Sequence, residues 1–278
     1  PYRWLEDDMS AETADWVKAQ NEVTFGYLET IGFRENIKQR LTALWNYEKI
    51  SAPSKEGDYN YFYKNDGLQN QWVVFRQKAD LPAEVFLDPN TFSSDGTTSL
   101  AGLQFSEDGS IAAYAISEGG SDWRKVRIIN SESKQQLEPE LVDVKFSGIA
   151  WRGNTGFFYS SYDKPDGSEL SAKTDQHKLY FHRLGTAQAD DQLIFGGSAD
   201  EKHRYVGADV TDDGQYLVVS ATNTTSGNKL FVKNLSDPAS VFVALDDEGS
   251  ADYELIDSRG DRLFFKTNFN APTQRLIA

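Results

Sequence analysis

The stretch Phe105-Ser106-Glu107-Asp108-Gly109-Ser110-Ile111-Ala112-Ala113-Tyr114 decides the fold, because it predicts a hairpin that recurs along the chain. Its polar Asp-Gly turn favours a tight reversal, since glycine adopts positive φ without steric cost. The apolar run after the turn is typical of a buried strand. A close copy is Val210-Thr211-Asp212-Asp213-Gly214-Gln215-Tyr216-Leu217-Val218-Val219, and weaker copies surround Gly57, Gly156 and Gly260.

These turn glycines give the repeat its period. Gly57, Gly109, Gly156, Gly214 and Gly260 follow one another at intervals of 52, 47, 58 and 46 residues. A third strand, and often a short fourth, follows each hairpin within the interval. Four antiparallel strands in about 50 residues are typical of a β-propeller blade. The alternative is an irregular β-sandwich, which would place turns every 8 to 12 residues, roughly, without a longer period.

The first 45 residues have a different pattern. Ser10 is a good N-cap, and apolar residues then recur at loose helical spacing from Trp16 to Leu28. A second helical stretch is predicted over residues 33–45. We therefore expect an N-terminal α-helical arm over residues 1–45, followed over residues 46–278 by a partial, all-β propeller domain of four to five blades.

Composition excludes several classes of protein. The 278 residues include 43 acidic and 28 basic side chains, a formal net charge of −15, with 6 Trp, 13 Tyr and 17 Phe. An aromatic-rich chain builds a core, and an acidic surface repels phosphate backbones and anionic lipids, so neither nucleic acid nor membrane is an expected partner. The absence of Cys excludes a thiolate nucleophile and thiolate-bound metal. We expect no cofactor and no metal site.

Catalytic motifs are missing from the sequence. No Ser is flanked as in Gly-x-Ser-x-Gly, which a hydrolase nucleophile elbow needs, and no phosphate-binding loop is present. The three histidines are His177, His182 and His203. We expect solvated or hydrogen-bonded roles for them, and we predict no catalytic residue in this chain.

Several strings together carry a resemblance to a known family. They are Pro1-Tyr2-Arg3-Trp4-Leu5-Glu6-Asp7-Asp8, Trp16-Val17-Lys18-Ala19-Gln20-Asn21, Asn65-Asp66-Gly67-Leu68-Gln69-Asn70-Gln71, Gly120-Ser121-Asp122-Trp123, and Val144-Lys145-Phe146-Ser147-Gly148-Ile149-Ala150-Trp151. In order and spacing the chain resembles the prolyl oligopeptidase family of serine peptidases, in particular its prolyl endopeptidase branch. The match extends to Arg275-Leu276-Ile277 at the end of the chain.

The resemblance implies a two-domain enzyme, in which a seven-bladed propeller covers a C-terminal α/β-hydrolase domain that carries the catalytic Ser, Asp and His. The hydrolase domain is then absent from this chain, and we expect the chain to be a piece of a longer protein. Phe146 falls where the family has an aromatic residue in the substrate pocket. Tyr205 falls in the same pocket where mammalian members have Met, so the resemblance implies that both residues bind substrate and that this part of the pocket is more polar. Asp122 falls at the family's interface between propeller and hydrolase. Alternatively, Phe146 is an ordinary strand aromatic and Asp122 a solvated turn residue.

Two hypotheses of function follow. In the first, which the resemblance implies, the chain is the lid and size filter of a serine endopeptidase that hydrolyses short peptides on the carboxyl side of proline. Its partners are then short proline-containing peptides and the hydrolase domain. The alternative is a stand-alone acidic binding module of propeller type without catalytic activity. We expect a cytoplasmic location, with the periplasm as the alternative.

Overall fold

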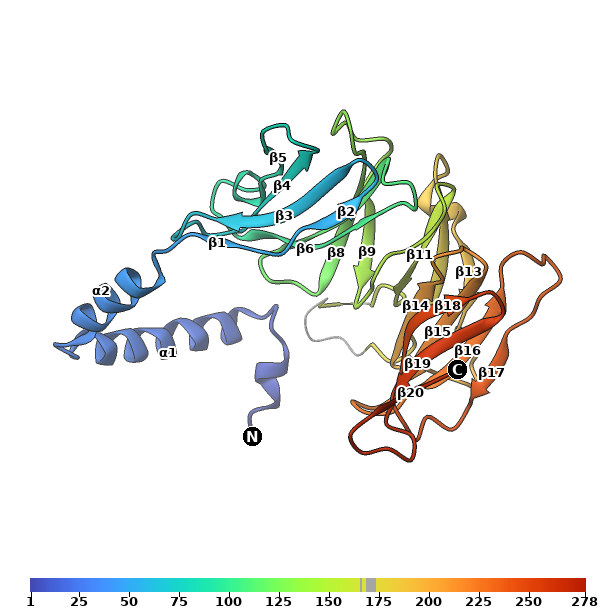
Figure 1. Cartoon of the computed structure of the whole chain (residues 1–278). Coiled ribbons are helices and arrows are strands. Elements are labelled where there is room, and N and C mark those ends of the chain that lie inside the picture. Colours follow the sequence, from blue (N-terminus) through green and yellow to red (C-terminus); the bar gives the residue numbers. More distant parts are fainter. Residues whose placement is uncertain (166, 169–173) are drawn as a thin grey trace. The chain divides into compact units, whose positions relative to one another are not determined.

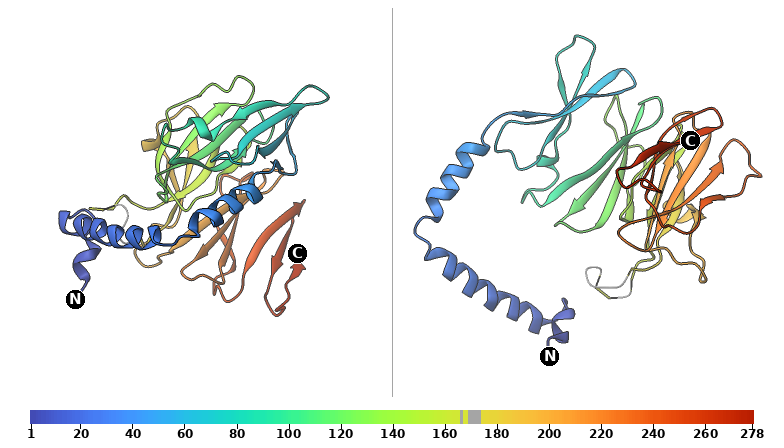
Figure 2. Two further views of the ribbon diagram at one scale, coloured as in Figure 1. Left: turned by 90° about the vertical axis from the view of Figure 1, so that its left-hand side faces the viewer. Right: turned by 60° about the horizontal axis from the view of Figure 1, so that its bottom comes forward.

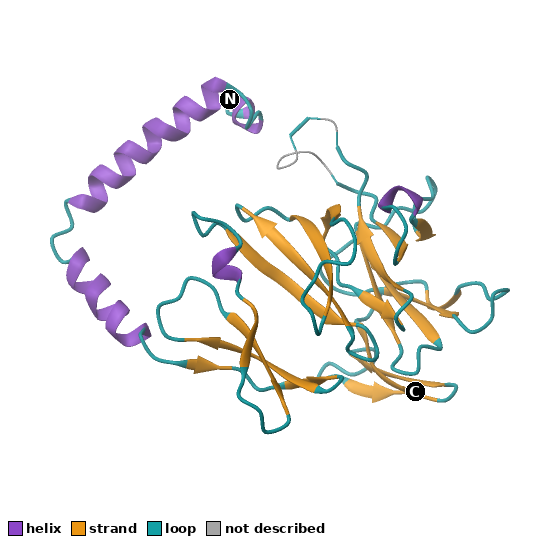
Figure 3. Cartoon of the chain, turned by 90° about the horizontal axis from the view of Figure 1, so that it is seen from above, coloured by secondary structure: helices purple, strands orange, loops and turns teal. Residues whose placement is uncertain are grey.

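The computed structural model describes residues 1–165, 167–168 and 174–278. The chain forms two compact units. One contains Pro1–Ser99 and a short segment from Lys164, and the other contains Leu100–Asp163 and Thr174–Ala278. Figure 3 shows that the long helices belong to the beginning of the chain and that strands make up most of the rest.

The first unit begins with the helical arm. It consists of a 3-10 helix (Arg3–Glu6), α1 (Ala11–Glu29) and α2 (Arg34–Trp45), and Figure 2 shows α1 and α2 joined by a short turn. The Ser10 hydroxyl accepts a hydrogen bond from the Thr13 N–H at 3.2 Å, which satisfies one free donor of the first turn. The Thr13 hydroxyl donates to the Trp4 carbonyl, and the Trp4 and Trp16 rings meet edge to face at 6.2 Å. The predicted helical arm and its cap are confirmed.

The first unit also holds the first sheet. Its strands are β1 (Lys49–Ile50), β2 (Ser54–Glu56), β3 (Tyr59–Asn65), β4 (Val73–Lys78) and β5 (Glu84–Leu87). The order is β1-β3-β4-β5, and β2 also pairs with β3, so the strand beside β3 is split into two short pieces.

Four further antiparallel sheets follow in chain order. They contain β6 (Thr98–Phe105), β7 (Ile111–Glu118), β8 (Trp123–Asn130) and β9 (Leu141–Lys145); β10 (Ala150–Arg152), β11 (Gly156–Ser161), β12 (Lys178–Arg183) and β13 (Gln192–Phe195); β14 (Tyr205–Val210), β15 (Tyr216–Thr222), β16 (Lys229–Asn234) and β17 (Val243–Asp246); and β18 (Tyr253–Arg259), β19 (Arg262–Thr267) and β20 (Arg275–Ile277). Each sheet is a meander whose strands pair in sequence order, as in a propeller blade (Figure 1). The prediction of four to five blades with a four-stranded pattern is confirmed, and the fifth sheet has three strands.

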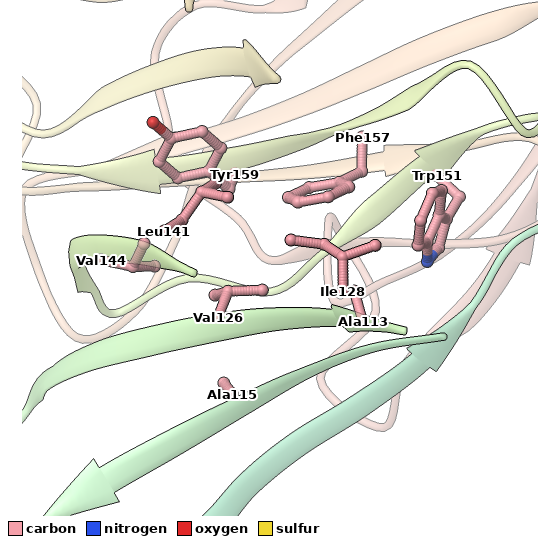
Figure 4. Packing of buried hydrophobic residues seen from close by; sticks show 9 residues of the cluster. All are labelled: Ala113, Ala115, Val126, Ile128, Leu141, Val144, Trp151, Phe157 and Tyr159. Carbon is pink, nitrogen blue, oxygen red and sulfur yellow. The ribbon is translucent and has the colours of Figure 1, made fainter. Parts of the chain in front are cut away.

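Strand β11 shows how neighbouring sheets pack in the second unit. All six of its residues are buried, because both faces are covered. Phe157 packs with Trp151 against the sheet β6–β9, where Figure 4 shows them near Ile128. Phe158 points to the opposite face and packs with Leu217 of the sheet β14–β17. The core of this unit therefore lies between successive sheets.

The Asp-Gly turns form as the sequence predicts. Asp108 Oδ1 accepts hydrogen bonds from the Ser106 hydroxyl at 3.1 Å and from the Ser110 N–H at 2.8 Å, and hydrogen bonds from Ser110 lower the Asp108 pKa to about 2. In the turn between β14 and β15, Asp213 Oδ1 accepts the equivalent hydrogen bonds from the Thr211 hydroxyl and the Gln215 N–H. Gly109 has a φ of +74°, which suits the absence of a side chain.

In the third sheet a different glycine makes the turn. The residue with positive φ there is Gly153, at +53°, and Gly156 instead begins β11. A Cβ on Gly156 would lie 2.1 Å from the His182 carbonyl oxygen of the paired strand. Gly156 therefore serves close packing of β11 against β12.

Replacing Gly109 with alanine tests the turn. We expect Gly109→Ala to lower the free energy of unfolding by about 1–2 kcal/mol, because a Cβ at this φ collides with the backbone. The measurement is urea denaturation followed by tryptophan fluorescence. The matched control is Gly102→Ala in β6, where a new Cβ meets nothing within 4 Å. Equal losses in the free energy of unfolding for Gly109→Ala and Gly102→Ala would contradict the requirement for glycine in the turn.

Candidate functional site

The two aromatic residues predicted to bind substrate lie together in the second unit. Phe146 follows β9 and Tyr205 begins β14, yet their ring centroids are 5.7 Å apart and their planes are inclined at 64°. Phe146 is 39% exposed and Tyr205 is 37% exposed, so each ring offers surface to a ligand. We call this pair the aromatic surface.

The backbone at Phe146 adopts an unusual conformation. Its φ is +52°, in the left-handed region that costs a non-glycine residue about 1–2 kcal/mol. Surrounding contacts must hold such a residue in place, and conformations of this kind cluster at binding sites.

Tyr162 and His177 adjoin the aromatic surface. The Tyr162 ring meets Phe146 edge to face at 6.3 Å and stacks on His177 at 4.3 Å. The Tyr162 hydroxyl donates a hydrogen bond to the carbonyl of Arg204, the residue before Tyr205. Burial raises the pKa of Tyr162 to about 12, so the hydroxyl remains a donor at neutral pH.

Lys145 brings a positive charge to the same place. Its Nζ lies 5.2 Å from the Phe146 ring centroid and 4.8 Å from the Trp123 centroid, which is cation–π geometry. Trp123 and Lys145 are paired across β8 and β9. Asp122, the predicted interface residue, immediately precedes β8 and is exposed at this same end of the sheet.

Strand direction explains why these residues meet. Phe146 follows the end of β9, and Trp123 and Tyr205 stand at the starts of β8 and β14. In each meandering sheet the starts of the first and third strands and the ends of the second and fourth strands share one edge. Strands β8 and β9 are the third and fourth of their sheet, and β14 is the first of its sheet. The Asp-Gly turns occupy the opposite edge, so the aromatic surface lies away from them.

The histidine nearest the aromatic surface is not available as an acid or a base. His177 is fully buried, and burial lowers its pKa to about 4, against a weaker raising effect of its hydrogen bond to the Lys145 carbonyl. Its imidazole is neutral at physiological pH and both nitrogens are hydrogen-bonded, which leaves no free base for catalysis. In the described ranges no group of three or more His, Asp or Glu side chains is arranged to hold a metal ion. No helix among the same residues is long and apolar enough to cross a bilayer.

A second histidine forms a buried charged network that the sequence did not indicate. His182 Nδ1 lies 2.7 Å from Asp191 Oδ1, and its Nε2 lies 2.9 Å from Glu138 Oε1. Burial opposes the charged imidazolium, but the two carboxylates outweigh it and raise the His182 pKa. The Tyr159 hydroxyl also donates to Asp191, and the network joins β12 to the segment between β8 and β9. Because Glu138 lies 44 residues away in the sequence, no local pattern could reveal it.

The third histidine is also buried. His203 is 3% exposed and stacks on Phe195 at 5.5 Å. Its Nε2 lies 3.7 Å from a carboxylate oxygen of Glu201. All three histidines thus have structural surroundings, and the His177 ring stacks on Tyr162, which in turn contacts Phe146 of the aromatic surface.

The helical arm presents a separate apolar surface in the first unit. A cavity of about 680 Å³ lies between α1 and α2, lined in part by Leu28, Ile31, Ile37 and Leu41. Ile37 is 50% exposed and Leu41 is 60% exposed. Helix faces of this kind normally pack against another part of a protein.

A helical arm followed by five meandering antiparallel sheets defines a partial β-propeller, which carries an exposed aromatic surface at one sheet edge. The family model of the prolyl oligopeptidase N-terminal beta-propeller domain matches residues 1–278. The chain therefore belongs to the prolyl oligopeptidase family, whose members are serine peptidases.

Sequences similar to the chain include prolyl endopeptidases. The chain is 54% identical over 278 residues to the prolyl endopeptidase of Elizabethkingia miricola and 53% identical to that of Elizabethkingia meningoseptica. The whole of this chain is matched in both cases, and it spans 39% of the length of each relative. Among solved structures, prolyl oligopeptidase B from Galerina marginata, bound to a 35mer hydrolysis and macrocyclization substrate, is similar with a TM-score of 0.88 and 30% identity, over 100% of this chain and 41% of that one.

Proposed function

We propose that this chain is the N-terminal and propeller portion of a serine endopeptidase that hydrolyses short peptides on the carboxyl side of proline. Membership of the prolyl oligopeptidase family and the 54% identity to a prolyl endopeptidase support the proposal. The observation that carries it is the pairing of Phe146 with Tyr205 as a half-exposed aromatic surface. Aromatic faces pack well against the flat, apolar rings and stems of a bound peptide.

In this proposal the propeller is a lid and a size filter. It supplies a wall of the substrate pocket through Phe146 and Tyr205, and it excludes water and folded proteins from the reaction. An α/β-hydrolase domain of the same protein supplies a Ser that attacks the carbonyl of the proline residue, a His that takes the Ser proton and later gives it to the leaving amine, and an Asp that orients the His. Asp122 contributes to the contact with that domain, and the exposed apolar side of the arm packs against it. The chain alone is then inactive, and the protein acts in the cytoplasm.

The direct test compares two samples. The full-length protein, expressed from the reading frame that contains this chain, is expected to release a chromophore from a blocked prolyl peptide, and residues 1–278 alone are expected to release none. Cleavage by residues 1–278 alone would overturn the assignment of catalysis to another domain. A full-length protein that binds such peptides without cleaving them would favour a binding module instead.

Phe146→Ala tests the substrate pocket. In the full-length protein we expect it to raise KM for a peptide with residues on the amino side of proline about tenfold, because roughly 1–2 kcal/mol of apolar burial is lost. We expect kcat to change little, since the reacting groups lie elsewhere. The control is Phe269→Ala, another exposed phenylalanine (41%) outside the aromatic surface. If both variants behave like wild type, Phe146 does not touch substrate.

A further inference from the structure

His177 connects the two halves of the aromatic surface. Its Nε2 lies 2.8 Å from the carbonyl oxygen of Lys145, the residue before Phe146. Its Nδ1 lies 2.8 Å from the backbone nitrogen of Val206, the residue after Tyr205. One imidazole therefore contacts the backbone beside both aromatic residues.

These contacts cross three sheets. Lys145 ends β9, His177 immediately precedes β12, and Val206 lies in β14. The His177 side chain is fully buried, and the backbone N–H of His177 donates to the His203 carbonyl at 2.8 Å. The ring thus belongs to the residue that precedes β12 of the middle sheet and contacts strands of the sheets on either side.

The partners determine which nitrogen carries the proton. A backbone N–H only donates and a carbonyl only accepts. Nδ1 must therefore accept from Val206, and the Nε2 proton must be donated to Lys145. A single neutral tautomer satisfies both contacts, which agrees with the burial of the ring and its lowered pKa.

We propose that His177 is a positioning residue for substrate recognition, which sets the spacing and orientation of Phe146 and Tyr205 by tying their neighbouring peptide groups together. The proposal rests on the proposed function, because it assumes that the aromatic surface binds peptide. Phe146 has a strained backbone, so loss of the Lys145 contact releases it toward an unstrained conformation. The Tyr162 ring, which stacks on His177 and meets Phe146 edge to face, supports the same geometry.

Three substitutions separate the two hydrogen bonds. His177→Gln places an amide nitrogen near the position of Nε2 and retains a donor for the Lys145 carbonyl. His177→Asn places a carbonyl oxygen near the position of Nδ1 and retains an acceptor for the Val206 N–H. His177→Leu removes both bonds at similar volume.

The measurement is how KM and kcat of the full-length protein depend on the length of the substrate. Two chromogenic substrates are compared, one blocked directly at proline and one extended by residues on the amino side. We expect His177→Leu to raise KM for the extended substrate about tenfold, while kcat for both substrates and KM for the short substrate change little. We expect the Gln and Asn variants to have KM values for the extended substrate between those of wild type and His177→Leu, because each retains one hydrogen bond. The control is His182→Gln, which removes a comparably buried histidine contacting neither Lys145 nor Val206.

The outcomes are distinct. A His177→Leu enzyme that loses activity equally on both substrates, or a His182→Gln enzyme with the same length-dependent defect, would show that His177 only stabilises the fold. If His177→Leu does not fold, the Gln and Asn variants decide the question by the same comparison. A wild-type protein that cleaves neither substrate would refute the proposed function and, with it, the role of His177. Wild-type cleavage without any length-dependent change in the variants would refute the role of His177 alone.

Discussion

Replacing Asp191 with alanine is expected to lower the free energy of unfolding by about 3–5 kcal/mol, because it removes one partner of a buried charged group. The side chains of His182, Asp191 and Glu138 are 1%, 3% and 8% exposed. Loss of the Asp191 carboxylate leaves His182 Nδ1 and the Tyr159 hydroxyl without this acceptor. Urea denaturation measures the effect.

The pH dependence gives the same experiment a second readout. Since the His182 pKa is raised in the folded protein, its charge contributes stability that is fully present below the unfolded pKa of about 6.5 and is lost as pH rises through the folded pKa. Asp191→Ala should therefore destabilise the protein more at pH 6 than at pH 9. The pKa of His177 is lowered, so its titration changes stability with pH in the opposite direction. Because His177 is present in both wild type and Asp191→Ala, this contribution cancels in the difference between their free energies of unfolding.

Asp190→Ala is the matched control, because the neighbouring carboxylate is exposed. We expect a change of roughly 0.5 kcal/mol or less. An Asp191→Ala variant that unfolds at the same urea concentration as Asp190→Ala, or a loss that grows as pH rises, would mean that the network does not carry a charged histidine.

Phe157→Ala is expected to cost about 3–5 kcal/mol as well, through a different mechanism. The Phe157 side chain has no exposed surface and packs between two sheets, with its ring 5.1 Å from Trp151 and 5.5 Å from His182. Truncation removes apolar burial and leaves a cavity that strands on both sides cannot close.

The comparison with Phe269→Ala tests this explanation. Phe269 is 41% exposed, so its removal leaves no enclosed cavity, and we expect a cost of about 1 kcal/mol or less. Thermal and urea unfolding of both variants provide the measurement. A Phe157→Ala variant as stable as Phe269→Ala would show that the contact between the second and third sheets contributes little to stability.

Local patterns predicted the hairpins and the helical arm. In the stretch from Ser106 to Ser110 the Asp side chain bonds within its own turn, and Gly109 provides the positive φ. Ser10 caps α1 through a residue three positions away. Such contacts join neighbours in the sequence, so their residue types and spacing suffice to predict them. The third turn shows the limit, since Gly156 is needed by a strand paired across the sheet and the turn is made by Gly153.

The candidate site was predicted only in part. The family resemblance singled out Phe146 and Tyr205, and the structure places their rings together, although their role in binding is still a prediction. Nothing in the sequence pointed to Tyr162 or His177 as their support. Asp122 lies exposed at the same sheet edge, and its role at a domain interface is likewise still a prediction.

The sequence by itself determined the repeating unit of this protein, because hairpins and helix caps depend on contacts within a few residues. Only the tertiary structure decided which side chains work together. His177 lies 32 residues from Lys145 and 29 from Val206, and His182 lies 44 residues from Glu138. Residues far apart in the sequence become neighbours because successive sheets pack face to face. Burial between the sheets keeps His177 neutral, whereas the carboxylates around His182 stabilise its charged form.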